Sequence, residues 1–489
     1  PPGTGITSLP PNCAGGSGSV VCLLGDVADK YVSVNLGLTA PPDLRGGGLL
    51  FTARTFGAES DFLDSNNVAT STATEYRVLL VTTTADDGAG SLRQAIRDAN
   101  ATCVTAAPCL IGFQIDAPGP WKTIAVASPL PAITAGNLLI DGTWQTQHVG
   151  DTNPDGPEIE ISGGGIYANG LTFALGRYCR GALAGVAIGG FGANGVLLTS
   201  GPGTCTDLQF RNDAARFDIR NVFAGTDPTG SSAHPNGLRG ITLDDKSFTG
   251  NAIIDSCVLS GNTRSGVFDV AGAATIDHNR LGVKAHSDEP LPNGASGIYI
   301  AAQYTTASDN VIAFNRDFGL SVDKSLTLVA FRRNRIWANN NLAIDNGLDG
   351  VMTPAPTDNP TVGTLSAPAL TRAQYDPATN TTTVEGDVHL ASGYMFVWGE
   401  VEVYSSDTPG TRNMGDAQRL IGNATVGVPM QTTTPPTHFT ATIAGDHTGE
   451  WITATVTRVR YETFASVQVI GGEINPRTSE LSFPMQVTP

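Results

Sequence analysis

Charged side chains able to act on a substrate are sparse in this chain, and their best local group is Asp244, Asp245 and Lys246 in LDDKS. Carboxylates of this kind serve as general acids, general bases or nucleophiles in polysaccharide cleavage. A solvated turn explains the same segment and is the favoured interpretation. The sequence has no GxSxG elbow, HExxH pair, P-loop or Rossmann fingerprint that would indicate another reaction.

Asp269 and Asp323 are two further catalytic candidates. In the repeat described below, Asp244 and Asp323 share one outward position and stand three repeats apart. Because neighbouring strands are spaced by about 4.8 Å, this separation is about 14 Å. The two carboxyl groups of a glycosidase lie roughly 5–9.5 Å apart. Asp244 and Asp323 are therefore not expected to form a catalytic pair.

Two aromatic residues at one position of the repeat, Phe268 and Tyr299, offer a binding surface instead. They are expected to face outward from neighbouring coils and to stack on each other. Such a stack is either a platform for a sugar ring or a structural aromatic ladder beneath an insert loop, and the structural interpretation is favoured. Arg264, Lys284 and Asp269 would supply hydrogen bonds to a glycan.

One segment resembles the start of a calcium loop. DTNPDG matches D-x-N-x-D-G and offers Asp151, Asn153 and Asp155 as ligands. The twelfth position of such a loop would be Ser162, so Glu158 or Glu160 would have to provide the bidentate carboxylate. A turn without metal is favoured, and a bound Ca²⁺ would be structural. No other cofactor is expected.

The elements that carry these residues are repeats. The segments RNVFAG, SCVLSG, HNRLGV, DNVIAF and RNRIWA align Asn221, Cys257, Asn279, Asn310 and Asn334. A second register, in RGITLD, SGVFDV, SGIYIA and FGLSVD, aligns Gly240, Gly266, Gly297 and Gly319, and upstream segments extend it to Gly170 and Gly195.

A period of about 22–25 residues indicates a solenoid. Short strands, one inward aliphatic residue per strand, and Gly and Asn at corners that need positive φ predict a parallel β-helix of about ten coils over residues 110–350. The competing leucine-rich repeat would need an L-x-x-L-x-L skeleton, which is missing.

A single amphipathic helix is predicted over residues 91–101. Ser91 and Gln94 form a capping box, and the apolar stripe consists of Leu92, Ala95, Ile96 and Ala99. A solenoid leaves an apolar, unpaired edge at its first coil. We therefore expect the helix to cap that end and to contribute stability rather than activity.

The spacing of the cysteines indicates the compartment of the protein, and the net charge limits its possible partners. Local spacing favours disulfides Cys13–Cys22, Cys103–Cys109 and Cys179–Cys205 of an exported protein over a zinc site, and leaves Cys257 as a buried thiol. The net charge of −17 disfavours nucleic acid and anionic membranes as partners. No apolar run approaches the roughly 18 residues of a membrane span.

The segments on either side of the predicted β-helix are expected to be separate domains. Residues 365–489 alternate with period two between turn residues, which predicts an Ig-like β-sandwich. We divide the chain into a partial Ig-like sandwich (1–75), a cap with its helix (76–109), the β-helix (110–355), and a linker with the C-terminal sandwich (356–489). The incomplete first sandwich is expected either to pack on the cap or to accept a strand from another chain, as a fibre subunit would.

The chain resembles the exported bacterial right-handed parallel β-helix proteins with a G-S-L-R-x-A-I signature. The resemblance covers about residues 77–355 and rests on DDGAGSLRQAIRDANA, IGFQI, LLIDGTWQ, GTDPTG and NLAIDNGLDGV. Residues 1–75 resemble the second half of a bacterial surface Ig-like repeat domain. The resemblance implies an all-β right-handed solenoid with a capping helix and Ig-like flanks, secreted or held at the bacterial cell surface.

Two classes of function follow. The first is an extracellular or cell-surface structural or adhesive protein, with a polysaccharide or cell-surface glycan, or another copy of itself, as partner. The alternative is a polysaccharide lyase or glycoside hydrolase that uses the outward face of the β-helix. The lack of a catalytic cluster and the modular order favour the first class.

Overall fold

The computed structural model describes residues 77–103, 108–205, 216–244, 251–270, 272–323, 329–348, 350, 365–390, 397–428, 436–460 and 474–489, and six short strands before residue 74. The chain forms two compact units, residues 1–77 and 78–489.

The first unit contains three antiparallel strand pairs. They are β1 (Gly5–Ser8) with β4 (Gly37–Thr39), β2 (Cys13–Gly16) with β3 (Ser19–Cys22), and β5 (Leu49–Arg54) with β6 (Val68–Ala73). Cys22 is disulfide-bonded, and Cys13 is its register partner across the β2–β3 hairpin. The Ig-like fold of this unit and its role in fibre assembly remain predictions.

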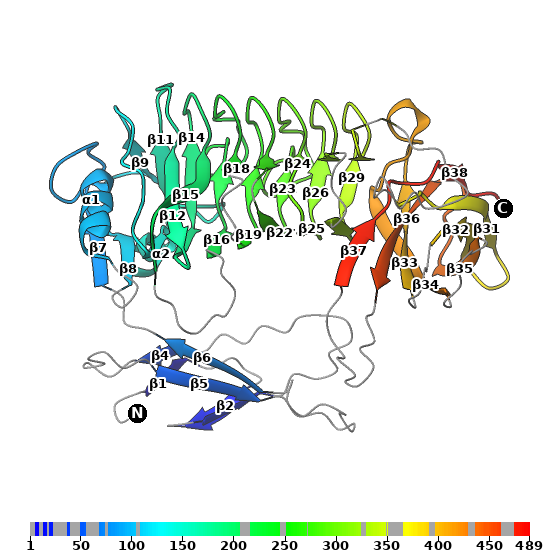
Figure 1. Cartoon of the computed structure of the whole chain (residues 1–489), viewed down its shortest axis with the longest axis horizontal. Helices are drawn as coiled ribbons and strands as arrows, with labels where there is room; N and C mark the ends of the chain where they lie inside the picture. Colours follow the sequence, from blue (N-terminus) through cyan, green and yellow to red (C-terminus); the bar gives the residue numbers. More distant parts are fainter. Residues whose placement is uncertain are drawn as a thin grey trace. The chain divides into compact units, whose positions relative to one another are not determined.

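The second unit begins with a right-handed parallel β-helix built from three sheets (Figure 1), which confirms the predicted fold class. Sheet 1 contains β7 (Arg77–Val81), β8 (Cys109–Phe113), β10 (Asn137–Asp141), β13 (Arg180–Ala184), β16 (Arg216–Arg220), β19 (Asn251–Asp255), β22 (Ala273–Asp277), β25 (Thr305–Ser308) and β28 (Val329–Arg332). Sheet 2 contains β9 (Lys122–Ala125), β11 (Ile159–Ser162), β14 (Val186–Gly189), β17 (Phe223–Ala224), β20 (Val258–Leu259), β23 (Arg280–Leu281), β26 (Val311–Ala313) and β29 (Arg335–Trp337). Sheet 3 contains β12 (Leu171–Arg177), β15 (Val196–Thr204), β18 (Ile241–Leu243), β21 (Val267–Asp269), β24 (Ile298–Ile300), β27 (Leu320–Val322) and β30 (Ile344–Asn346).

The described part of the solenoid has fewer coils than expected. Sheet 2 has eight strands, one per coil, where the repeat period predicted about ten coils. Several coils are longer than the period because they carry inserts. For example, β10 begins at Asn137 and the next strand of sheet 1, β13, begins only at Arg180, with the helix α2 (Thr143–Val149) between them.

Buried asparagine ladders run along the corners of the coils. The Asn279 side chain donates to Ile254 O at 2.8 Å and to Asn310 Oδ1 at 3.0 Å, and Asn310 donates to Asn334 Oδ1 at 2.9 Å. A second ladder of the same kind links Asn236, Asn262, Asn293, Asn315 and Asn339.

The predicted alignment is wrong by one residue at its first member. The pairing of Phe223 with Val258 places Val222, not Asn221, opposite Cys257. Asn221 takes the preceding corner position at φ 52°, which Ser256 and His278 occupy in the next coils at 57° and 56°. Asparagine tolerates this left-handed conformation better than most residues do, so an Asn in this repeat fits either corner position.

The aligned glycines are required by close approach between coils and not by positive φ, contrary to the prediction. A Cβ atom on Gly240 would lie 2.8 Å from Gly266 O, and one on Gly266 would lie 2.9 Å from Gly297 O. The same contact recurs from Gly297 to Gly319 O at 2.8 Å. Residues with positive φ stand elsewhere in the coil.

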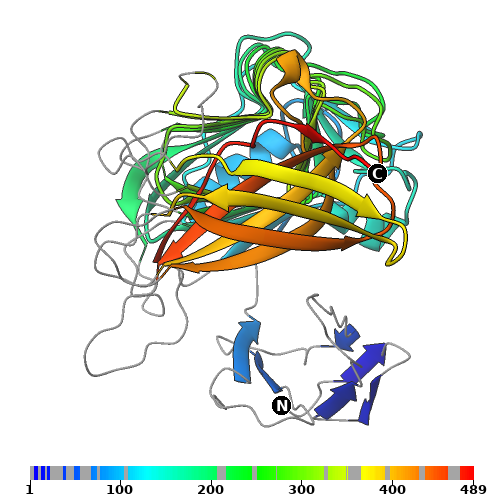
Figure 2. The same ribbon diagram turned by 90° about the vertical axis from the view of Figure 1, so that its right-hand side faces the viewer.

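Two antiparallel sheets complete the second unit (Figure 2). One contains β31 (Ala369–Asp376), β32 (Thr381–Val388) and β35 (Thr437–Ala444). The other contains β33 (Val397–Ser406), β34 (Arg419–Val428), β36 (Trp451–Arg460) and β37 (Ile474–Thr478), with β38 (Met485–Gln486) on β36 and the 3-10 turn η2 (Thr411–Asn413) between β33 and β34. Val384, Val401 and Val456 belong to the buried cluster shared by the two sheets.

The second of these sheets covers the last coil of the β-helix. Ile336 and Ala417 exchange backbone hydrogen bonds of 2.7 and 2.6 Å, and Phe331 N donates to Thr478 Oγ1 at 2.8 Å. Tyr404 and Leu481 are buried in the same cluster as the β-helix core. The exit end of the solenoid is therefore closed by β-sheet rather than by a helix.

Asp416 at this junction makes stability depend on pH. Burial raises the pKa of its carboxyl from 3.8 to about 6, although Ala338 N donates to Oδ2 at 3.1 Å. Between pH 4 and pH 6 the folded chain holds a proton on Asp416 that the unfolded chain has lost. The contribution of this carboxyl group to stability is therefore fully present below pH 4 and is lost as the pH rises through 6. Asp416→Asn removes this titration. As the pH rises from 4 to 7, we expect the free energy of unfolding of the variant to increase relative to that of the parent by ~3 kcal/mol at most.

Urea unfolding at pH 4.5 and pH 7.5 measures this effect. Asp407→Asn is the control, because a hydrogen bond from Arg419 lowers the pKa of Asp407. Its carboxyl is therefore ionised at both pH values, and its replacement should change stability by nearly the same amount at each. Equal differences between parent and Asp416→Asn at both pH values would contradict the assignment.

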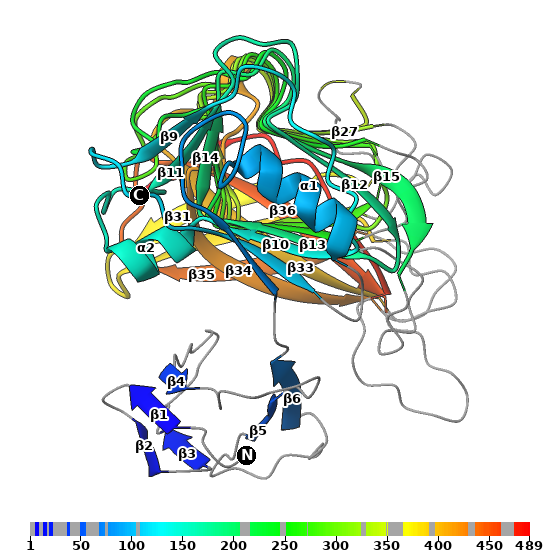
Figure 3. The ribbon, with the colours of Figure 1, turned by 90° about the vertical axis from the view of Figure 1, so that its left-hand side faces the viewer.

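The helix α1 (Leu92–Thr102) lies across the entry end of the β-helix (Figure 3). Leu92, Ile96 and Ala99 are buried in the same cluster as Ile111 and Phe113 of β8. The helix therefore caps the first coil, as predicted. Half of the capping box forms: Gln94 N donates to Ser91 Oγ at 3.2 Å, whereas the Gln94 side chain donates to Asp98.

Disulfides join Cys103 to Cys109 and Cys179 to Cys205, as predicted, and Cys257 is a free, buried thiol. Burial raises the pKa of Cys257 to about 12.

Disulfides form and persist in oxidising compartments, so the chain is an exported protein. None of the helices in the described residues is long and apolar enough to cross a membrane.

Candidate functional site

An aromatic stack lies on the outer side of sheet 3. Phe268 on β21 and Tyr299 on β24 are register partners, and their ring centroids are 4.9 Å apart with an interplanar angle of 12°. This stack confirms the predicted phase of the strands. The next residues in the same row, Thr242 and Ser321, are buried, whereas both rings are partly exposed.

A guanidinium covers one end of the stack. The Arg239 Cζ atom lies 3.6 Å from the centroid of the Phe268 ring, a cation–π contact. Burial and the positive charge of Arg264 lower the pKa of Arg239, and Asp244 acts in the opposite direction. Arg264, a predicted glycan ligand, is exposed beside this group. The repeat gives no signal for Arg239, because the aligned positions in the next two coils hold Ser265 and Ser296.

The candidate carboxylates Asp244 and Asp323 flank the stack. Asp244 follows β18 and Asp323 follows β27, three strands away, so the register keeps them about 14 Å apart as predicted. Burial and the charge of Asp323 raise the pKa of Tyr299, which keeps its hydroxyl protonated. Asp245 and Lys246 lie outside the described residues.

Two predicted ligands lie elsewhere. Asp269 is fully buried and accepts a hydrogen bond from Thr305 Oγ1 at 2.6 Å, because its register partners Leu243 and Ile300 face the core. Lys284 belongs to an insert that follows β23 of sheet 2, where its Nζ lies 2.6 Å from Glu289. Neither residue faces the aromatic stack.

The candidate calcium ligands are dispersed among protein hydrogen bonds. Asp151 and Asp155 are exposed, while the buried Asn153 uses its Nδ2 to donate to two backbone carbonyls. Glu158 accepts hydrogen bonds from Thr146 Oγ1 and Thr152 N. Burial alone would raise the pKa of Glu160, but hydrogen bonds from His234 and Thr123 outweigh it and lower the pKa. Within the described ranges no three His, Cys, Asp or Glu residues form a metal-binding group, and calcium binding stays a prediction.

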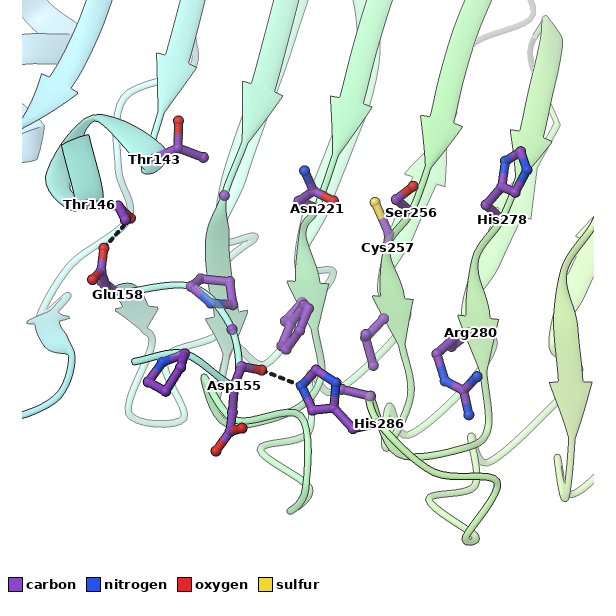
Figure 4. A pocket seen from close by; sticks show the side chains of 17 residues that line it. Thr143, Thr146, Asp155, Glu158, Asn221, Ser256, Cys257, His278, Arg280 and His286 are labelled. Atoms are coloured by element: carbon purple, nitrogen blue, oxygen red, sulfur yellow. Dashed lines mark hydrogen bonds between the residues drawn. The ribbon is translucent and has the colours of Figure 1, made fainter. Parts of the chain in front are cut away.

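Sequence reasoning missed a groove on sheet 2 (Figure 4). Its volume is about 390 Å³. It is lined by α2, the 154–158 turn, the strands β17, β20 and β23, and the insert at 285–286. A sequence offers no sign of such a groove, because its lining comes from five coils and an insert that meet only in the folded solenoid.

No protein-family model matches this chain, and no curated protein does. Among solved structures, a mutant of the periplasmic alginate epimerase AlgG aligns with 12% identity and a TM-score of 0.27, over 67% of this chain and 91% of the epimerase. The enzymatically active domain of bacteriophage CBA120 tailspike protein 4 aligns with 10% identity and a TM-score of 0.20, over 85% of this chain and 70% of that domain. Scores this low do not inform the function of the chain, and the fold rests on its own strand pairing.

Proposed function

We propose that this protein is a secreted, cell-surface structural or adhesive β-helix that binds carbohydrate on the outer side of sheet 3. The observation that carries the proposal is the partly exposed Phe268–Tyr299 stack. The β-helix supplies a rigid, capped scaffold, so the two rings are already held in place before a ligand arrives.

The stack has the chemistry that a sugar ring requires. Phe268 is covered by Arg239 on one face and by Tyr299 on the other, so Tyr299 provides the ring face that packs against the C–H face of a sugar. The charged groups around it form hydrogen bonds with the sugar hydroxyls. Arg264 offers donors, Asp244 offers acceptors, and the protonated Tyr299 hydroxyl offers both.

Binding is favoured over cleavage at this surface. Asp244 and Asp323 are separated by about 14 Å, too far for the carboxyl pair of a glycosidase. The raised pKa of Tyr299 disfavours the phenolate that a general base would need. The alternative, a lyase or hydrolase, is tested by incubating the chain with neutral and uronate polysaccharides and measuring unsaturated products and reducing ends. Turnover that is lost in Tyr299→Phe would support the alternative.

Replacing either ring is expected to weaken glycan binding. Tyr299→Ala should raise the dissociation constant about tenfold, because losing a stacking contact costs about 1.4 kcal/mol. Phe268→Ala should also raise it, because this change removes the ring that holds Tyr299 in place. Affinity electrophoresis against a panel of soluble polysaccharides, followed by calorimetry on the best binder, measures the change.

Tyr167→Ala is the matched control, since this tyrosine is 85% exposed and lies before β12, away from β24 in sheet 3. It should bind like the parent. Unchanged affinity in Phe268→Ala and Tyr299→Ala, with folding intact, would show that the stack is only a structural ladder.

A further inference from the structure

The groove on sheet 2 is large enough for a small ligand and is formed mainly by regular structure. Its volume of about 390 Å³ falls within the range of ligand pockets, roughly 300–1,000 Å³. Neighbouring strands of one sheet form its base, and the turn at 154–158 and the insert at 285–286 form its walls (Figure 4). His286 connects these two walls, since its Nε2 lies 2.6 Å from Asp155 O.

The floor of the groove is apolar. Phe223 and Val258 form, with Ala187, a small buried cluster separate from the β-helix core, and Ala285 of the insert packs against it. Such a floor contacts the C–H face of a sugar ring and excludes water beneath it.

The rim of the groove is polar and offers both donors and acceptors. Glu158 is 2% exposed and already accepts hydrogen bonds from Thr146 and Thr152. The accessible acceptors of the rim are therefore the hydroxyl groups of Thr143 and Ser256. Across the floor, His278 is anchored through its Nδ1, 3.3 Å from Asp255 Oδ1, and Arg280 is anchored by Asp288 at 2.8 Å. Fixed donors and acceptors around an apolar floor suit a polyhydroxylated ring.

The charges of the groove favour an uncharged ligand. Arg280 shares the Asp288 carboxylate with Arg335, which lies 2.7 Å from it, so the positive charge of Arg280 is only partly neutralised. Asp155 and Glu158 leave the lining with excess negative charge, and the whole chain carries −17. A uronate would meet like charges here, and like-charge contacts lower affinity.

From this combination we infer that the groove is a second carbohydrate subsite, which takes one or two residues of a neutral oligosaccharide. The inference rests on the proposed carbohydrate-binding function and adds a site on another sheet, with its preferred ligand class. Two of the coils that form the groove, those of β20 and β23, also present the aromatic stack through β21 and β24, so one chain would hold two glycan segments.

The test uses the full chain and three probes: cellohexaose, mannohexaose and hexagalacturonate. Hydrogen exchange should show protection of residues 221–224, 256–259 and 284–286 by a neutral hexasaccharide and none by hexagalacturonate. Ala285→Trp, which fills the groove, should abolish this protection and lower binding at the groove at least tenfold. His286→Ala should weaken binding at the groove several-fold. Because His286 is exposed, this substitution should leave the fold intact. Ala378→Trp, in an exposed turn after β31, is the control and should behave as the parent.

The outcomes separate this inference from the proposed function. Groove protection that survives in the Phe268→Ala, Tyr299→Ala double variant supports the second subsite, whether or not the stack also binds. Binding that depends on the stack, with no protection of the groove by either neutral probe, overturns the inference and leaves the proposed function standing. Tighter binding of hexagalacturonate than of both neutral probes at the groove would also overturn it.

Discussion

Asn310→Ala is expected to lower the free energy of unfolding of the second unit by at least about 3 kcal/mol. The Asn310 side chain accepts from Asn279 N at 2.9 Å and from Asn279 Nδ2 at 3.0 Å, and it donates to Ile276 O at 2.7 Å and to Asn334 Oδ1 at 2.9 Å. Alanine satisfies none of these groups. Because the corner is fully buried, water cannot replace the lost partners, and each unsatisfied group costs about 1–3 kcal/mol.

Urea unfolding followed by circular dichroism measures this loss. Asn251→Ala is the control, because Asn251 is exposed at the start of β19 and should cost less than about 0.5 kcal/mol. Similar losses in both variants would show that the ladder contributes no more than an ordinary surface asparagine does.

Ile96→Ala, in the capping helix, should destabilise the second unit by about 2–4 kcal/mol. Ile96 is fully buried in the cluster that includes Ile111 and Phe113, so the change leaves a cavity between α1 and the first coil. Weaker docking of α1 also exposes the apolar edge of that coil, which should promote self-association.

Thermal unfolding and light scattering across concentration measure these two effects. Arg97→Ala is the control, since the Arg97 side chain is half-exposed and its ion pair with Asp87 is on the surface. Glycan affinity should stay unchanged in both variants, because the stack lies in sheet 3, several coils from the cap. A normal unfolding midpoint in Ile96→Ala would show that the helix is not a stabilising cap.

Most of the solenoid was predictable because its strands repeat one local pattern. The spacing of Gly240, Gly266 and Gly297 and of Asn279, Asn310 and Asn334 marks equivalent positions in successive coils, and parallel stacking then places like residues together. The stacking of Phe268 on Tyr299 followed from the same register. The error at Asn221 shows the limit of this reasoning, because two adjacent corner positions both accept asparagine.

The sequence by itself determined the β-helix, its capping helix, two disulfides and the row that holds the aromatic stack, because these depend on residues close in the chain or equivalent in the repeat. Only the tertiary structure decided that Asp269 is buried, that Arg239 covers Phe268, that β-sheet closes the exit end, and that inserts from separate coils form a groove. Contacts of this second kind join side chains and loops that no period relates. Their geometry depends on how far each insert extends from its coil, and residue spacing does not encode that distance.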